Sequence, residues 1–293
     1  MNCTAIEYVV NPEPKALKKM SDKKMYKERK ANIAVFRGCK FNCCYCAFKN
    51  TLRFNTECPD CLTFTPHVHW ESLTKTPPKT KDGEFITIGL NGDISFATDT
   101  QISSFLKYCK EWGDRNFMIQ TKDPRRLCGW NMYIPKNVTI GTTIESDYPQ
   151  LFKRKLIEPK IVDNRIISDY ELLIYSDISK APFPEKRYEA MQCLRVHNKI
   201  ALTIEPILEF NIDNFIKWIK VLTPLEYLWI GYDSKPEINH LPEPPLAKTQ
   251  QFIKRLEDAG ISVHQKLMRL AWYETELIQE LQCDTFHKIM EDK

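Results

Sequence analysis

Three cysteines with a defined spacing are the residues of this sequence best suited to chemistry. Cys39, Cys43 and Cys46 are separated by three residues and then by two, within the segment Arg37-Gly38-Cys39-Lys40-Phe41-Asn42-Cys43-Cys44-Tyr45-Cys46. A loop with this spacing can place three thiolates around one face of a [4Fe-4S] cluster. A cluster that only transfers electrons takes four cysteine ligands, so three thiolates leave one iron open to a substrate or a cofactor.

Two other interpretations of this segment are open. The same cysteines could belong to a structural zinc site, whose ligand pairs are often two to four residues apart. Cys44 could also shift the register, so that Cys39, Cys44 and Cys46 form the set. The single residue between Cys44 and Cys46 would strain the grip on a cubane cluster, and we therefore expect Cys44 to be a bystander.

A second group of metal-binding residue types follows in the next part of the chain. Cys58 and Cys61 form a C-x2-C pair, and His67 and His69 come shortly after it. The set could form a tetrahedral zinc site, or the cysteines could help to hold a second iron–sulfur cluster. The alternative is two thiols in a turn without a metal. Pro66 suits the first position of a helix, on which residues two apart do not share a face, so we expect that the histidines do not bind one metal together.

The composition is that of a globular chain without a membrane segment. Of 293 residues, 43% are hydrophobic and 27% are charged, and no apolar run approaches the roughly 20 residues that span a bilayer. The N-terminus lacks the basic and apolar regions of a signal peptide. Eleven cysteines in such a chain indicate metal binding in a reducing cytoplasm rather than disulfides.

The net charge is only +4, but cations are concentrated near the N-terminus. The segment 1–30 forms a basic arm that contains Lys15, Lys18, Lys19, Lys23, Lys24, Lys27, Arg29 and Lys30. Such an arm could contact the phosphates of a nucleic acid, or it could simply be solvated.

Alternating strand and helix patterns organise residues 31–270 into one domain. Apolar runs predict strands at 32–38, 84–90, 116–121, 138–144, 199–204, 227–232 and 261–267, and amphipathic stretches predict helices that include 99–112 and 212–222. This alternation predicts an α/β fold with parallel strands, either a partial (β/α) barrel or a doubly wound sheet. A long insertion at 47–83 follows the first strand, 147–177 is a second insertion that could form a lid, and 271–293 predicts a C-terminal helix.

Several segments together resemble the radical S-adenosylmethionine (SAM) superfamily. They are Arg37-Gly38-Cys39 through Cys46, Phe64-x-Pro66-His67, Gln120-Thr121-Lys122, Gly141-Thr142-Thr143-Ile144-Glu145 and Ile204-Glu205-Pro206. The segments are similar to those of a branch of phage and archaeal type that is related to spore photoproduct lyase. The resemblance implies a partial barrel of the radical SAM type. It also implies an enzyme that cleaves SAM reductively to a 5′-deoxyadenosyl radical, which then abstracts hydrogen from a substrate.

The resemblance further implies roles for individual residues. The open iron would chelate SAM, Tyr45 would lie beside the adenine, and the turn Asn91-Gly92-Asp93 would bind the amino group of SAM. Lys122 follows a strand, where a cation could meet the SAM carboxylate or a substrate anion, although it could also be a surface lysine. Glu145 and Glu205 also follow strands, and their carboxylates could orient the ribose or the substrate.

Two partners complete this hypothesis. A one-electron donor such as flavodoxin or ferredoxin would reduce the cluster, and the basic arm together with the resemblance favours a nucleic acid or nucleotide as substrate. The competing hypothesis is a nucleic-acid-binding protein that is stabilised by zinc or an iron–sulfur cluster and has no redox turnover.

Overall fold

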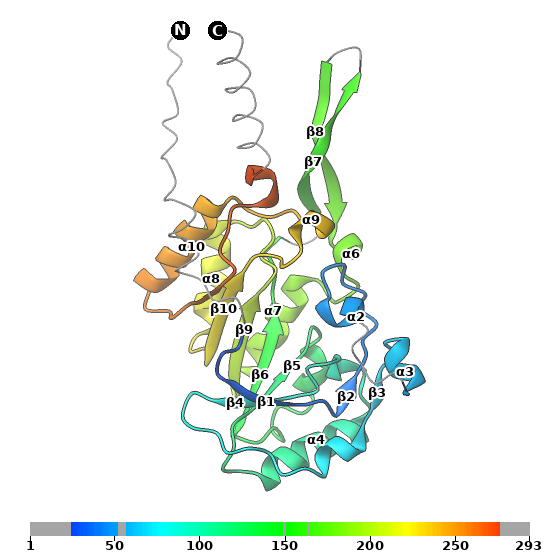
Figure 1. Cartoon of the computed structure of the whole chain (residues 1–293). Helices are drawn as coiled ribbons and strands as arrows, with labels where there is room; N and C mark the ends of the chain where they lie inside the picture. Colours follow the sequence, from blue (N-terminus) through cyan, green and yellow to red (C-terminus); the bar gives the residue numbers. More distant parts are fainter. Residues whose placement is uncertain (1–24, 52–56, 149–150, 163–164, 276–293) are drawn as a thin grey trace, which may run out of the picture.

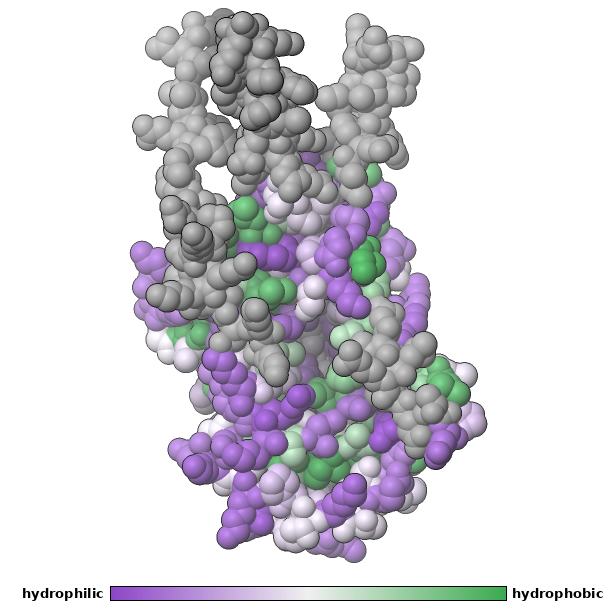
Figure 2. All heavy atoms as spheres, viewed as in Figure 1, coloured by the Kyte–Doolittle hydropathy of each residue, from purple (hydrophilic) through white to green (hydrophobic). Residues whose placement is uncertain are grey.

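The computed structural model describes residues 25–51, 57–148, 151–162 and 165–275. Most of the predicted basic arm and most of the predicted C-terminal helix therefore lie outside the described residues. Within these ranges, no helix combines the length and the apolar character needed to cross a bilayer. On the face shown in Figure 2, hydrophobic residues appear as separate groups between hydrophilic ones.

A parallel sheet forms the centre of the fold (Figure 1). Its strands are β1 (Arg29–Ile33), β4 (Phe85–Ile88), β5 (Phe117–Gln120), β6 (Val138–Thr143), β9 (Lys199–Ile204), β10 (Tyr227–Gly231) and β11 (His264–Lys266), paired in that order. The strand order follows the chain order, without the reversal that defines a doubly wound sheet. The sheet curls into a half-barrel, which confirms the predicted α/β partial barrel.

Helices between consecutive strands cover the outer face of the sheet (Figure 1). They are α4 (Asp99–Glu111), α5 (Arg125–Cys128), α7 (Pro184–Leu194), α8 (Ile212–Leu222) and α10 (Leu246–Asp258). Alternate strand residues such as Ile119, Ile140 and Leu202 pack in one core cluster with helix residues such as Phe105 and Phe215. Apolar burial on this face is the main force that holds the helices against the sheet.

The opposite face of the strands lines the inside of the half-barrel. Phe85, Met118, Ala201 and Trp229 form a small buried cluster there, and Tyr26 packs against Phe85 and Trp229 in edge-to-face geometry. The period of two along each strand produces this division, because successive side chains point to opposite faces. The apolar cluster closes one part of the interior, and polar residues further along the same strands face the space beyond it.

Capping residues stabilise several helix ends. Thr98 and Gln101 form a capping box at the start of α4, and the Asn211 side chain accepts from the Asn214 amide at the start of α8. Gly260 follows α10 with a φ of +77°, a left-handed conformation that favours glycine after a helix.

The region between β1 and β4 differs from its prediction. The strand predicted at 32–38 is divided: β1 ends at Ile33, and Phe36–Arg37 forms a separate strand, β2. β2 pairs antiparallel with β3 (His67–Val68), so the helix predicted to begin at Pro66 is wrong. Pairing with β2 outweighs the local preference of proline for a helix start.

The rest of this insertion holds the short helices α2 (Ala47–Thr51) and α3 (Pro59–Leu62) and the 3-10 turn η1 (Trp70–Leu73).

The insertion predicted at 147–177 contains an antiparallel hairpin. Its strands are β7 (Leu151–Val162) and β8 (Arg165–Ile174), which project from one end of the half-barrel and are followed by α6 (Tyr175–Ile178) (Figure 1). At the base of the hairpin, Phe152 is buried whereas Leu151, Leu172 and Ile174 are exposed. Apolar residues therefore occur on both faces of the hairpin, and they give no clear alternation in the sequence. The remaining short elements are η2 (Ile94–Phe96) and α9 (Pro236–Asn239).

Candidate functional site

A cavity of about 280 Å³ lies at the carboxyl ends of the parallel strands. Residues from the cysteine loop and from six strand ends line it, among them Cys39, Cys43, Tyr45, Cys46, Gly92, Asp93, Lys122, Thr143, Glu205, Asp233 and Lys266. The carboxyl edge is where barrels of parallel strands gather functional residues, because the loops that follow the strands meet there. The placement of the cysteine loop at this edge agrees with the order of elements in the sequence.

The three predicted cluster cysteines lie together on this cavity, and none is in a disulfide. The Phe41 amide is 3.4 Å from Cys39 Sγ, the Lys49 amide is 3.4 Å from Cys46 Sγ, and the Ser179 hydroxyl is 3.0 Å from Cys43 Sγ. Hydrogen bonds of this kind to sulfur are one means by which proteins tune iron–sulfur clusters.

Burial has the largest effect on the pKa values of these thiols. Burial, followed by the nearby Asp93 carboxylate, raises the pKa of Cys39 well above the usual thiol range, and the neighbouring cysteines add to the rise. Burial also raises the pKa of Cys46. A metal-binding thiol must be deprotonated, and the positive charge of the bound metal then offsets the repulsion between neighbouring thiolates.

Cys44 has a different environment from its neighbours. Its side chain is exposed and is not among the residues that line the cavity, and its amide donates to Ile178 O at 2.9 Å. This placement supports the register in which Cys44 is a bystander.

The start of the cysteine loop is joined to the turn after β4 by close backbone contacts. Gly38 N donates to Asn91 O at 3.3 Å, and Asp93 N donates to Gly38 O at 3.1 Å. A Cβ on Gly92 would lie 2.5 Å from Gly38 O, so only glycine permits this approach. Gly38 has a φ of +82°, and a Cβ there would lie 2.2 Å from Thr65 O. Asn91 itself does not line the cavity; its side chain accepts from Asn32 Nδ2 at 2.6 Å.

Asp93 lines the cavity, but its carboxylate is occupied by the protein. It accepts from the Ser95 amide at 3.0 Å, the Ser95 hydroxyl at 2.7 Å, the Thr121 hydroxyl at 2.6 Å and the Lys122 amide at 2.7 Å. Burial raises the pKa of Asp93, and these hydrogen bonds oppose the rise. Asp93 therefore ties the turn after β4 to the end of β5.

Glu145 lies behind the cavity in a buried network. Lys122 Nζ is 2.6 Å from both Glu145 Oε1 and the Tyr45 hydroxyl oxygen, and the Tyr45 hydroxyl donates to Glu145 Oε1. Burial alone would raise the pKa of Glu145, but the cations Arg187 and Lys122 hold it well below its usual range. The fully buried Glu145 carboxylate thus connects Tyr45 of the cysteine loop with Lys122 after β5.

Sequence reasoning missed two members of this network, Arg187 and Tyr175. Arg187 of α7 is fully buried; its Nη2 lies 2.6 Å from Glu145 Oε2 and 2.5 Å from the Tyr175 oxygen. The remaining guanidinium donors reach Thr143 O and, at 2.9 Å, Pro182 O. A signal was present: Arg187 precedes Met191 and Leu194 at helical spacing, and a cation on an apolar helix face indicates a buried partner.

One carboxylate oxygen of Glu205 has no hydrogen-bond partner among the described residues. Its Oε1 is bonded by Lys266 Nζ, whereas the buried Oε2 has no hydrogen-bond partner in the described part of the chain. Burial raises the pKa of Glu205, although the Lys266 ammonium opposes the rise. A buried oxygen without a partner is costly, and at the wall of a cavity it suits a ligand that donates a hydrogen bond.

Cys58 and Cys61 do not line this cavity. They lie with His67 and His69 in a separate group, in which all four ligand atoms are within 4.8 Å of one another. We expected that His67 and His69 would point in different directions, and this expectation is wrong, because their side chains meet in one group. In the extended segment around β3, residues two apart point the same way.

Comparison with known proteins supports the fold. No protein-family model and no curated protein matches the sequence. Among solved structures, the chain is similar to a point mutant of spore photoproduct lyase, a radical SAM enzyme, with a TM-score of 0.51 and 10% identity over 81% of this chain and 76% of that chain. It is also similar to a double mutant of that enzyme with bound AdoMet and dinucleoside spore photoproduct, with a TM-score of 0.49 and 10% identity over the same shares. The likeness establishes the fold.

Proposed function

We propose that this chain is a radical SAM enzyme that holds a [4Fe-4S] cluster on Cys39, Cys43 and Cys46. One observation carries the proposal: three thiols line one cavity at the carboxyl edge of a parallel half-barrel. No other cysteine of the described residues lines that cavity. This donor set fits a four-iron cluster with one iron left for a cofactor, since a cluster saturated by protein would take four cysteines.

The proposal gives the chain's residues the task of binding and orientation. When bound, the reduced cluster supplies one electron for the cleavage of SAM, and hydrogen abstraction from a substrate follows. Glu205 Oε2 would accept a hydrogen bond from a hydroxyl or amino group of SAM, which would supply the partner that this oxygen lacks among the described residues. Tyr45 is held in place by Lys122 and Glu145, and the apolar side chains of Phe48, Phe64 and Leu90 exclude water from the cavity.

Within this proposal, the substrate class is a nucleic acid or nucleotide. The basic arm of the sequence supports this class because its cations can meet phosphates. At the cavity itself, Lys122 and Lys266 are paired with Glu145 and Glu205, which leaves Lys235 as the lining lysine placed to meet a phosphate. Incubation with deuterated oligonucleotides and SAM tests the class, and we expect transfer of deuterium into 5′-deoxyadenosine. Transfer from a peptide or a small metabolite, with none from oligonucleotides, would replace the substrate class and leave the reaction type intact. The electron donor, such as flavodoxin or ferredoxin, stays a prediction.

Anaerobic reconstitution with iron and sulfide tests the reaction. We expect iron and sulfide in the stoichiometry of one [4Fe-4S] cluster per chain, and 5′-deoxyadenosine after addition of dithionite and SAM. Cys39→Ala, Cys43→Ala and Cys46→Ala should each abolish both readouts, whereas Cys44→Ala should retain them because its side chain is exposed away from the cavity. A protein that binds iron and sulfide but never cleaves SAM contradicts the proposal, and equal loss in Cys44→Ala contradicts the ligand assignment.

A further inference from the structure

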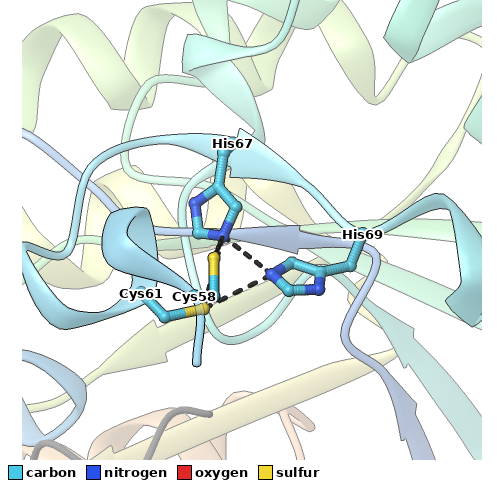
Figure 3. A group of neighbouring side chains, drawn as sticks. All are labelled: Cys58, Cys61, His67 and His69. Carbon is cyan, nitrogen blue, oxygen red and sulfur yellow. Dashed lines mark hydrogen bonds between the residues drawn. The ribbon is translucent and has the colours of Figure 1, made fainter. Parts of the chain in front are cut away.

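A second group of ligand-type side chains lies outside the cavity, in the insertion between β2 and β4. Cys58 is the N-cap of α3 and Cys61 lies within that helix, and His67 and His69 come from β3 and the residue just after it. Figure 3 shows the four side chains pointing toward one another. All four ligand atoms lie within 4.8 Å of one another, and no cysteine of the group is in a disulfide.

Three distances between sulfur and nitrogen in this group suit a four-coordinate site. Cys61 Sγ is 3.3 Å from the Nε2 atoms of both His67 and His69, and Cys58 Sγ is 3.4 Å from His67 Nε2. A tetrahedral zinc ion with ordinary Zn–S and Zn–N bonds separates its ligand atoms by roughly 3.3–3.8 Å. The two Nε2 atoms are closer, at 2.7 Å, so a metal between them would open the pair slightly.

The outer hydrogen bonds orient both imidazoles for a metal. His67 Nδ1 is 2.7 Å from Thr65 O, and His69 Nδ1 is 2.7 Å from Glu71 Oε1. Both partner oxygens accept, so each Nδ1 is the donor of its contact and each Nε2 is the ring nitrogen turned toward the group. The two Nε2 atoms lie 2.7 Å apart, so one metal ion could be reached by both rings. A carbonyl or carboxylate on the outer nitrogen is the usual support of a histidine that binds a metal.

We propose that Cys58, Cys61, His67 and His69 bind one structural zinc ion. Two thiolates and two imidazoles in tetrahedral arrangement are a donor set that zinc favours. The group leaves no ligand position for a substrate, as in structural zinc sites. A two-iron cluster would need its ligands in pairs on separate irons, whereas here one sulfur is equidistant from both histidines.

The proposed zinc site lies where it would stabilise the cysteine loop. The segment that follows α3 supplies Phe64 O, which accepts from the Cys39 amide at 3.1 Å, and β3 pairs with β2 just before the loop. Arg37 Nη1 also lies 3.6 Å from Cys61 Sγ. The zinc ion would therefore fix the segment against which Gly38 and Cys39 are packed, without contact to the proposed cluster.

Metal analysis of the full-length protein, purified without added metal, tests the site. We expect one zinc per chain, and Co²⁺ exchanged for it should give the absorption of a tetrahedral thiolate complex. Cys58→Ser and His67→Ala should lose zinc, whereas Cys39→Ala should keep it and lose only iron. Cys193→Ser, at an exposed thiol outside both groups, is the matched control and should keep both metals.

Two further variants test the zinc site even if Cys58→Ser and His67→Ala fold poorly. His69→Cys retains four ligands and should retain zinc, and Glu71→Gln should lower zinc affinity by about 10- to 100-fold because it weakens the support of His69. Absence of zinc and of Co²⁺ binding in folded protein would overturn the proposal. So would iron and sulfide that disappear in Cys58→Ser but persist in Cys39→Ala. Zinc present without any SAM cleavage would support this site and contradict only the proposed function.

Discussion

Removal of the Arg187 guanidinium should be one of the most damaging single changes in this protein. Arg187→Met keeps much of the aliphatic volume but leaves the Glu145 carboxylate facing one cation instead of two. Both partners of the pair are fully buried, so water cannot replace the lost donor. The change also takes donors away from Thr143 O and Pro182 O.

The size of the effect follows from this burial. Breaking a buried ion pair by removing one partner costs about 3–5 kcal/mol. At roughly 2–4 °C per kcal/mol, the melting temperature should fall by about 6–20 °C, and this chain of 293 residues belongs toward the lower end. Arg125→Met is the matched control, because the side chain of Arg125 is 53% exposed in its pair with Asp123. Its expected cost is about 0–1 kcal/mol.

Urea unfolding and thermal melts of both variants measure this difference. In a double-mutant cycle, Glu145→Gln with Arg187→Met should cost less than the sum of the single changes, since the second change removes the stranded charge. We expect a coupling energy of about 0.5–3 kcal/mol. Equal stability of Arg187→Met and Arg125→Met, or strict additivity in the cycle, would refute the argument that this network stabilises the fold through its buried charges.

Three further predictions follow from the same site. Glu205→Gln should weaken SAM binding by about 10- to 100-fold in calorimetry, since a hydrogen bond to a charged acceptor contributes about 1.5–3 kcal/mol, and an unchanged affinity would exclude Glu205 as a SAM ligand. Gly92→Ala should destabilise the protein by about 1–3 kcal/mol because its Cβ meets Gly38 O at 2.5 Å, whereas Gly129→Ala, with no atom within 4 Å of its Cβ, should be nearly neutral. The pKa of Glu145 is lower in the folded protein than the value of about 4.3 in an unfolded chain, so its stabilising contribution is present above that pH and is lost as the pH falls below it. The free energy of unfolding should therefore depend on pH less steeply below about pH 4.3 in Glu145→Gln than in the parent, and identical slopes would contradict the assignment.

Much of the sheet and its helices could be predicted because their signals are local. The strand Lys199–Ile204 and the helix Ile212–Leu222 have the predicted bounds, since an apolar run and an amphipathic stretch with an asparagine cap determine them nearly alone. The three cysteines and the strand-end residues Lys122 and Glu205 also lie at one cavity, because parallel strands bring their carboxyl ends to one edge.

The parts that were not predicted depend on contacts between distant residues. Pro66 gives a local helix signal, but the pairing of Arg37 with His67 makes the segment extended and brings the two histidines to one side. The role of Glu145 depends on Arg187, which lies 42 positions later, and no spacing rule connects the two residues. Periodicity identifies the face on which such a side chain lies, but it does not identify the partner.

The cysteine loop itself shows why a recognisable motif does not determine its own geometry. Its first residues are held by Asn91 O and Phe64 O, and its later ones by Ile178 O and by Lys180 N, which donates to Phe41 O at 2.6 Å. These contacts come from three segments that are far apart in the sequence. The close backbone approach at Gly92 positions the first, the proposed zinc site would position the second, and the third follows the hairpin of β7 and β8. Because three independent supports hold the loop, the arrangement of the thiols should survive moderate strain in any one of them. The zinc-ligand variants should accordingly lower the stability of the cluster loop without removing its capacity to bind iron.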